Sequence, residues 1–135
     1  MGKASVAVCV LSFALAACSL DKKEAEPEPN IPPTNYRQEI LDTLTRTLDD
    51  PTNVREASIS EPELRAAGQS QRYVVCLRFN PRDLNRRYIG QQVRIAYFFG
   101  GRLNQLIEAT PEQCGRAAYK PFPELEKLCL ASKCA

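Results

Sequence analysis

The sequence predicts an α+β domain: an N-terminal amphipathic helix packed on a small antiparallel β-meander of about four strands, then short C-terminal helical turns, stapled by disulfides. Three observations indicate this class. Apolar residues recur at helical spacing after Asn35, and they alternate at strand spacing in several segments between residues 55 and 109. Two adjacent glycines separate the last two of these segments, as in a tight hairpin.

The helix is predicted to begin near residue 36. Its apolar stripe recurs every third to fourth position and consists of Tyr36, Ile40, Leu41, Leu44 and Leu48. Asn35 followed by Gln38 approximates a capping box, and Asp42 is spaced to pair with Arg46 on the wet side. Pro51 is predicted to end the helix, because the residue before a proline avoids the α-helical region.

Four strands are predicted, at residues 55–59, 73–79, 92–99 and 102–109. In the second strand one face carries Tyr73, Val75, Leu77 and Phe79, and the other carries Val74, Cys76 and Arg78. The inward residues of the third strand are predicted to be Val93, Ile95, Tyr97 and Phe99, and Leu103 and Ile107 share a face of the fourth. Gly100–Gly101 is the predicted hairpin turn. Short helical turns follow at Thr110–Gln113, with a capping box and a stop near Gly115, and at Pro123–Leu128.

The first residues are predicted to form a targeting signal. Lys3 precedes an apolar stretch over residues 4–14, which is too short to span a membrane. The ending Leu15-Ala16-Ala17-Cys18 resembles the lipobox of bacterial lipoprotein precursors. This resemblance implies a signal peptide over residues 1–17, cleavage between Ala17 and Cys18, and fatty acyl chains such as palmitate on Cys18. An ordinary secretory signal with a cysteine nearby by chance is the alternative.

A tether and one folded domain are predicted after the signal. Residues 18–35 are rich in Pro and Glu and contain few apolar residues, which is typical of a spacer. Residues 36–135 then form a single small α+β domain. Ser19 stands where an aspartate would retain an enterobacterial lipoprotein in the inner membrane. The resemblance therefore implies an outer-membrane anchor and a domain that faces the periplasm, rather than inner-membrane retention.

The cysteines predict a disulfide framework. Cys9 lies in the signal and Cys18 takes the lipid, which leaves Cys76, Cys114, Cys129 and Cys134. In an exported chain these four allow three pairings, and we favour Cys76–Cys114 with Cys129–Cys134. A zinc site or free thiols are the alternatives, but zinc ligands come in close pairs and the chain has no histidine. No metal and no cofactor is predicted.

Charge is distributed unevenly along the folded part. Residues 72–102 contain seven arginines and one acid, whereas residues 39–63 contain seven acids and two arginines. Guanidinium groups suit phosphate and carboxylate, so we take as candidate binding residues Arg78, Arg82, Arg86, Arg87, Tyr88 and Arg94. Their expected partner is an envelope protein or an anionic glycan or lipid, and the compartment excludes nucleic acid. A solvated face paired with the acidic helix is the alternative.

The function class that best fits is a non-catalytic envelope lipoprotein with a binding or structural role. The absence of histidine removes Ser-His-Asp and Cys-His catalysis, and no catalytic residue is predicted. The stretch 48–52 with Val75-Cys76, Asn80 and Tyr88-Ile89-Gly90 resembles small exported bacterial lipoproteins, which implies export and no particular activity. The alternative is a small envelope hydrolase, or an inhibitor of one of the lysozyme type.

Overall fold

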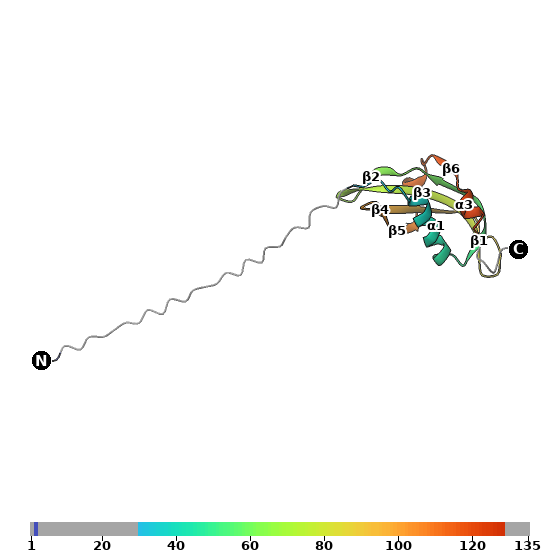
Figure 1. Ribbon diagram of the computed structural model, residues 1–135, viewed down its shortest axis with the longest axis horizontal. Helices are drawn as coiled ribbons and strands as arrows, with labels where there is room; N and C mark the ends of the chain where they lie inside the picture. Colours follow the sequence, from blue (N-terminus) through green and yellow to red (C-terminus); the bar gives the residue numbers. More distant parts are fainter. Residues whose placement is uncertain (1, 3–29, 129–135) are drawn as a thin grey trace.

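Six strands form one antiparallel sheet in the part of the chain that this computed structural model describes, which is Gly2 and residues 30–128 (Figure 1). The strands are β1 Asp50–Ser60, β2 Glu63–Ala67, β3 Ser70–Arg82, β4 Gln92–Phe99, β5 Arg102–Glu108 and β6 Tyr119–Pro121. The helices are α1 Tyr36–Thr47, α2 Pro111–Cys114 and α3 Pro123–Glu126. The α+β class and the antiparallel sheet are confirmed, whereas the predicted number of about four strands is too low.

The sheet order is β5-β4-β3-β1-β6, and β2 pairs with β3 beyond the end of β1. The two additional strands are β2, which is mostly exposed and shows no apolar alternation, and β6, which has three residues. The first strand is also longer than predicted, since it begins at Asp50 and runs through Pro51. Its pairing with β3 is interrupted by bulges, where Asn53 and Glu56 adopt positive φ angles of 55° and 53°. These bulges hide the strand from a search for strict alternation.

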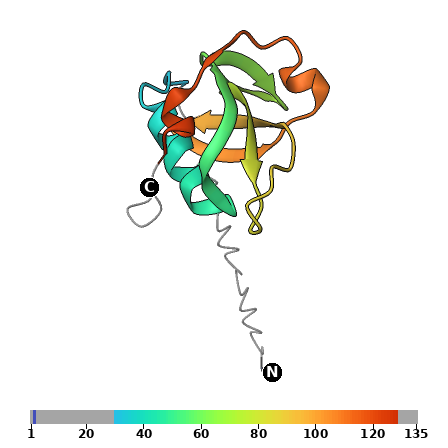
Figure 2. The same cartoon turned by 90° about the vertical axis from the view of Figure 1, so that its right-hand side faces the viewer.

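The main core lies between one face of the sheet and the helices α1 and α3, which Figure 2 shows side by side over the strands. Helices α1 and α3 contribute Ile40, Leu44 and Leu125, and the residue before α3 contributes Phe122. Strand β3 contributes Val75, Leu77 and Phe79. The predicted capping box at the start of α1 is wrong, because the Asn35 side chain makes no capping hydrogen bond. Gln38 instead donates to Asp42 at 2.7 Å. The ion pairs of the described residues do not include the predicted pair of Asp42 and Arg46.

The opposite face of the sheet carries a second, smaller core of Val74, Cys76, Ile95 and Cys114. Cys76 is paired with Ile95, and directly paired residues point to the same face. The residues of β4 that face the main core are therefore Ala96 and Phe98. The prediction that Val93, Ile95, Tyr97 and Phe99 face inward is wrong, because Val93, Ile95 and Tyr97 pack in the smaller core on the opposite face. The alternation of apolar residues does not identify the inward face of β4, because both faces of the sheet are covered and apolar residues occupy both.

The hairpin between β4 and β5 has the predicted turn, with positive φ angles at both Gly100 and Gly101. A bulge then shifts the register, because Tyr97 pairs with Gln105 and Phe98 with Leu103. Leu103 consequently shares the main core with Leu106 and not with the predicted Ile107, which is 44% exposed. Ile31 lies beside this turn, since a Cβ on Gly101 would be 3.1 Å from its Cγ2. The segment that precedes α1 thus meets the folded domain at the β4–β5 hairpin.

Candidate functional site

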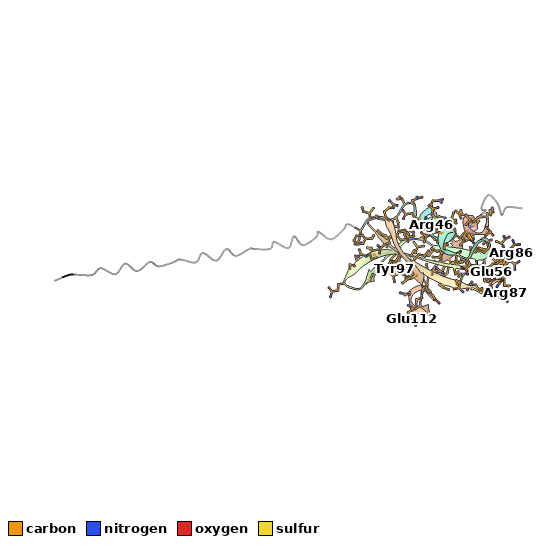
Figure 3. The ribbon with its side chains drawn as sticks, turned by 90° about the horizontal axis from the view of Figure 1, so that it is seen from below. Arg46, Glu56, Arg86, Arg87, Tyr97 and Glu112 are labelled. Atoms are coloured by element: carbon orange, nitrogen blue, oxygen red, sulfur yellow. A yellow bond between two sulfur atoms is a disulfide. The ribbon has the colours of Figure 1, made fainter. Side chains whose placement is uncertain are left out.

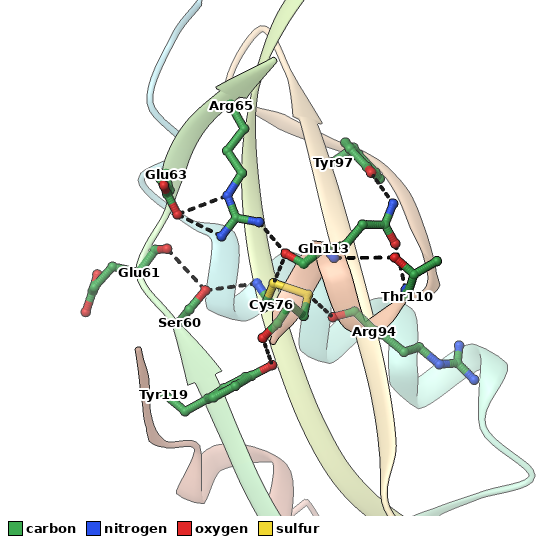
Figure 4. The surroundings of a disulfide bond; sticks show 11 residues. Ser60, Glu61, Glu63, Arg65, Cys76, Arg94, Tyr97, Thr110, Gln113 and Tyr119 are labelled. Atoms are coloured by element: carbon green, nitrogen blue, oxygen red, sulfur yellow. Dashed lines mark hydrogen bonds and ion pairs between the residues drawn. A yellow bond between two sulfur atoms is a disulfide. The ribbon is translucent and has the colours of Figure 1, made fainter. Parts of the chain in front are cut away.

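The disulfide joins the middle of β3 to the end of α2 (Figure 4). The predicted bond between Cys76 and Cys114 is confirmed, and both residues are buried. The sequence places Cys114 through the predicted capping box, in which Gln113 donates its backbone N–H to the Thr110 hydroxyl at 3.3 Å and accepts the Thr110 N–H at 2.8 Å. Cys18, Ala17, Cys129 and Cys134 lie outside the described residues, as does the predicted signal.

The loop between β3 and β4 is held by hydrogen bonds from its own residues. The Asp83 carboxylate accepts the backbone N–H groups of Asn85 at 2.8 Å and Arg87 at 3.0 Å. These bonds, above all the one from the Arg87 backbone, lower the pKa of Asp83. The Tyr88 hydroxyl donates to the backbone carbonyl of Asn53 at 2.7 Å, which fastens the loop to β1. The loop therefore presents its outer side chains from a fixed backbone.

We define the tip as Arg55, Leu84, Arg86, Arg87 and Tyr88. The guanidinium carbon of Arg55 lies 4.0 Å from the centroid of the Tyr88 ring, and Leu84 is 78% exposed. Sequence reasoning missed two members. Arg55 lies in the acidic part of the chain, and Leu84 is a lone apolar residue whose exposure no local pattern reveals.

The tip lies at the end of the domain away from the point where the chain joins it. Figure 3 shows Arg86 and Arg87 together at one extremity, with Glu56 close to them. The loop leads into the first residue of β4, whereas Ile31 lies by the turn after its last residue. Those two ends of β4 are about 24 Å apart at a rise of ~3.4 Å per residue.

The structure separates Arg78 and Arg94 from the tip, and it pairs the charge of Arg82 with an acid. Arg94 is paired with Leu77 and so points to the α1 side, where its guanidinium carbon is 5.9 Å from the Phe79 ring centroid. Arg78 is paired with Val93 on the opposite face. Arg82 forms an ion pair with Asp50, with 2.7 Å between Nη2 and Oδ2. Arg82 also forms a β-bridge with Tyr88 and so adjoins the tip, whereas Arg78 and Arg94 do not share a surface with Arg86, Arg87 and Tyr88.

The ion pair between Asp50 and Arg82 joins the start of β1 to the end of β3. Asp50 Oδ1 also accepts the Thr52 hydroxyl at 2.6 Å and the Thr52 N–H at 3.0 Å. Burial by itself raises the pKa of Asp50, but the hydrogen bonds from Thr52 and Arg82 outweigh burial and lower the pKa below its usual value. The charged carboxylate therefore stabilises the fold.

Asp50→Ala is expected to lower the free energy of unfolding at pH 7 by about 3 kcal/mol, because it leaves Arg82 partly buried without its partner. In the unchanged protein this contribution is complete above the unfolded pKa of about 3.9 and is lost as the pH falls through the lower folded pKa. Urea unfolding of both proteins between pH 7 and pH 2 measures it. The matched control is Asp49→Ala at the exposed neighbour. Equal losses for both variants would contradict this role of Asp50.

A groove runs along the sheet face opposite α1. A hollow of about 290 Å³ between β4 and α2 is lined by Val93, Pro111 and Cys114. A second hollow of about 530 Å³ lies toward β1 and β6 and is bordered by Glu56, Lys120 and Glu126. Arg78, Gln91 and Tyr119 line both hollows, so the two adjoin at these side chains. We call them together the Arg78 groove.

Comparisons with known proteins add no family to these features. No protein-family model, no curated protein and no solved structure matches the chain. Within Gly2 and residues 30–128, no three Cys, Asp or Glu side chains are grouped so that they could hold a metal ion. Nor does any helix of this part combine the length and the apolar character that crossing a bilayer requires. The candidate sites are therefore the tip and the Arg78 groove.

Proposed function

We propose that the chain is a lipid-anchored protein of the bacterial cell envelope, without catalytic activity, that binds an anionic envelope component or partner protein through its tip. The anchor rests on the sequence ending at Cys18, which resembles a lipobox. Export into an oxidising compartment is supported by the disulfide between Cys76 and Cys114, since such bonds persist outside the cytoplasm. Ser19 after the anchor favours the outer membrane, with the domain in the periplasm.

The observation that carries the binding proposal is the fixed and exposed loop of the tip. Arg86 is exposed, and the Arg87 side chain is 74% exposed even with its Nε 3.4 Å from Asp83 Oδ2. Because Asp83 holds the backbone, binding would cost little additional loop entropy. Leu84 adds exposed apolar area beside these cations. Cationic and apolar groups together suit an anionic lipid or protein surface better than a glycan alone.

The position of the tip fits a tethered domain. A spacer over residues 18–35 would approach the domain at the β4–β5 hairpin, which is the end away from the tip. The tip would then be free to contact a surface other than its own point of attachment.

The alternative is an inhibitor of an envelope hydrolase of the lysozyme type. An inhibitor of this kind needs a protruding loop with a fixed backbone, and the β3–β4 loop has these properties. The proposed function and this alternative depend on the same side chains, so one variant tests both.

Arg86→Glu with Arg87→Glu is expected to weaken binding to anionic vesicles by at least about tenfold, because each arginine near such a surface contributes ~1 kcal/mol. The measurement is cosedimentation of the chain beginning at Ser19 with phosphatidylglycerol vesicles and, separately, with peptidoglycan sacculi. Binding of the unchanged chain should fade between 0.1 M and 1 M salt, as the Debye length falls from about 10 Å to about 3 Å.

The matched control is Arg46→Glu with Arg116→Glu, which changes the net charge equally at exposed arginines outside the tip. Equal binding by both double variants, or no binding by the unchanged chain, contradicts the proposal. Sedimentation with sacculi alone would assign a glycan or its peptides in place of lipid. Inhibition of lysozyme that is lost only in the Arg86/Arg87 variant would favour the alternative function.

A further inference from the structure

The Arg78 side chain is held in place without being neutralised. Its Nε donates to the Ser58 hydroxyl at 2.9 Å, and its guanidinium carbon lies 4.2 Å from the centroid of the Tyr119 ring. One edge and one face of the guanidinium group are thus engaged by neutral partners. Within residues 30–128 its two Nη atoms have no hydrogen-bond or ion-pair partner, and the side chain lines both hollows of the groove. These two nitrogens form a fork that matches a carboxylate end-on.

Neighbouring arginines show how unusual this arrangement is. Arg82, Arg87 and Arg102 each form an ion pair with an acid of the domain, namely Asp50, Asp83 and Glu39. Arg72, Arg86 and Arg94 have no such partner in the described part of the chain, but they border none of the described hollows. Arg78 is itself exposed, like Arg86. Arg78 alone among the arginines of residues 72–102 combines a fixed side chain, an unpaired charge and a place in a groove.

The part of the groove around Arg78 is fixed by covalent and hydrogen bonds. The disulfide ties Cys114 to β3, and the Tyr119 hydroxyl donates to the Cys114 carbonyl at 3.3 Å. Val93, Ala109 and Pro111 supply an apolar wall, and Gln91 adds an exposed amide. A preformed hollow with an apolar wall and a few polar groups is typical of sites for small ligands.

The far side of the groove is acidic. Glu56 borders it from the bulge of β1, and a bulge turns a side chain away from the direction that a regular strand would give it. Glu126 borders it from α3, with one oxygen accepting the Ala57 N–H at 3.1 Å. Neither acid forms an ion pair with Arg78 in the described part of the chain. Lys120 also borders this side, but its Nζ lies 3.1 Å from Glu61 Oε1. The groove therefore has a cationic centre and, apart from this paired lysine, an acidic side.

We propose that the Arg78 groove binds a short peptide, whose terminal carboxylate pairs with Arg78 and whose amino group lies toward Glu56 and Glu126. A polyanion such as a phosphate group would also suit the guanidinium fork, but the two glutamates would repel it. A zwitterionic peptide matches both signs of charge, and its small side chains match the apolar wall. The groove adjoins the tip at Glu56. The peptide site depends on Arg78, however, and the proposed function depends on Arg86 and Arg87, so the failure of one is distinguishable from the failure of the other.

The test is binding of trialanine to the full chain, purified in a mild detergent and followed by NMR of the Gln91 amide and the Tyr119 ring. Trialanine should shift these signals at millimolar concentration, and trialanine amide, which lacks the carboxylate, should bind at least about tenfold more weakly. N-acetyl-trialanine should bind more weakly than trialanine, because it lacks the cation. Inorganic phosphate should bind more weakly than trialanine.

Two variants assign the charges. Arg78→Gln should weaken trialanine binding by about tenfold or more, whereas Arg46→Gln on the exposed side of α1 should leave it unchanged. Glu56→Gln should weaken binding of trialanine but not of N-acetyl-trialanine. An intact disulfide and unchanged amide signals outside the groove report that Arg78→Gln is folded. If it is not, Arg78→Lys takes its place, since it keeps the charge and lacks the fork. No shift with trialanine, equal binding of the amide, or tighter binding of phosphate would each overturn the proposal.

Discussion

Cys18→Ser is expected to abolish acylation and to leave either an uncleaved precursor or a protein that moves from the detergent phase to the aqueous phase. The thiol is the only group to which the proposed diacylglycerol attaches, and two or more acyl chains contribute ~0.8 kcal/mol of membrane affinity per buried methylene. The measurements are detergent phase partitioning of the expressed protein and the intact mass of the chain. The unchanged protein should show the mass of the acylated chain beginning at Cys18.

The matched control for the anchor is Cys9→Ser, which alters the other cysteine of the N-terminal region and should leave both acylation and partitioning unchanged. Mature protein of the acylated mass from the Cys18→Ser gene would contradict the anchor. So would an unchanged chain whose mass shows a free N-terminal cysteine. In the second case an ordinary secretory signal would explain the first residues, whereas the first case would place the acyl chains on another residue.

Replacing Cys76 and Cys114 together by alanine is expected to lower the free energy of unfolding by about 4 kcal/mol, because the bond closes a chain segment with a sequence separation of 38. Loss of this bond would also remove the covalent link between α2 and the sheet and weaken the smaller core, in which both cysteines are buried. Urea unfolding of the oxidised proteins measures the change.

The comparison is with Cys129→Ala and Cys134→Ala, whose predicted bond would close a much shorter loop and contribute only about 2 kcal/mol. A larger loss for this second pair would contradict the role given to the Cys76–Cys114 bond. Recovery of Cys76 or Cys114 as an alkylated thiol from unreduced protein would contradict the bond itself.

Several features could be read from the sequence because each depends on neighbouring residues. The capping box needs only Thr110 and Gln113, and the turn needs only Gly100 and Gly101. The disulfide could be predicted for a related reason. Cys76 alternates with the apolar row of β3, so its face is known, and Cys114 follows the returning hairpin closely enough to cover that face.

Other features depend on contacts that no local pattern records. The face of β4 is ambiguous because apolar residues occupy both of its sides, and only pairing with β3 decides between Ile95 and Ala96. The bulge beside Leu103 likewise changes which residues of the rest of β5 face the main core, because it shifts the pairing with β4 by one residue.

The binding residues also could not be grouped correctly from the sequence alone. Counting charges along the chain groups Arg78, Arg82 and Arg94 with the tip, whereas the pleat places the first and last on opposite faces. Arg82 is neutralised by Asp50, which lies 32 positions earlier. Such a partner is found only once the strands are paired.

The position of α3 at the end of the described chain has a consequence for biosynthesis. Phe122 and Leu125 are fully buried in the main core, and Arg37 of α1 is tied to Glu124 across 87 positions. The core therefore cannot close on the ribosome before residue 125 has left the exit tunnel, and non-local contacts of this kind also slow folding. A nascent chain whose core waits for its last helical turn stays threadable during synthesis. That is the state in which a secretion channel accepts its substrates, so the late closure of this core is compatible with the export proposed for the protein.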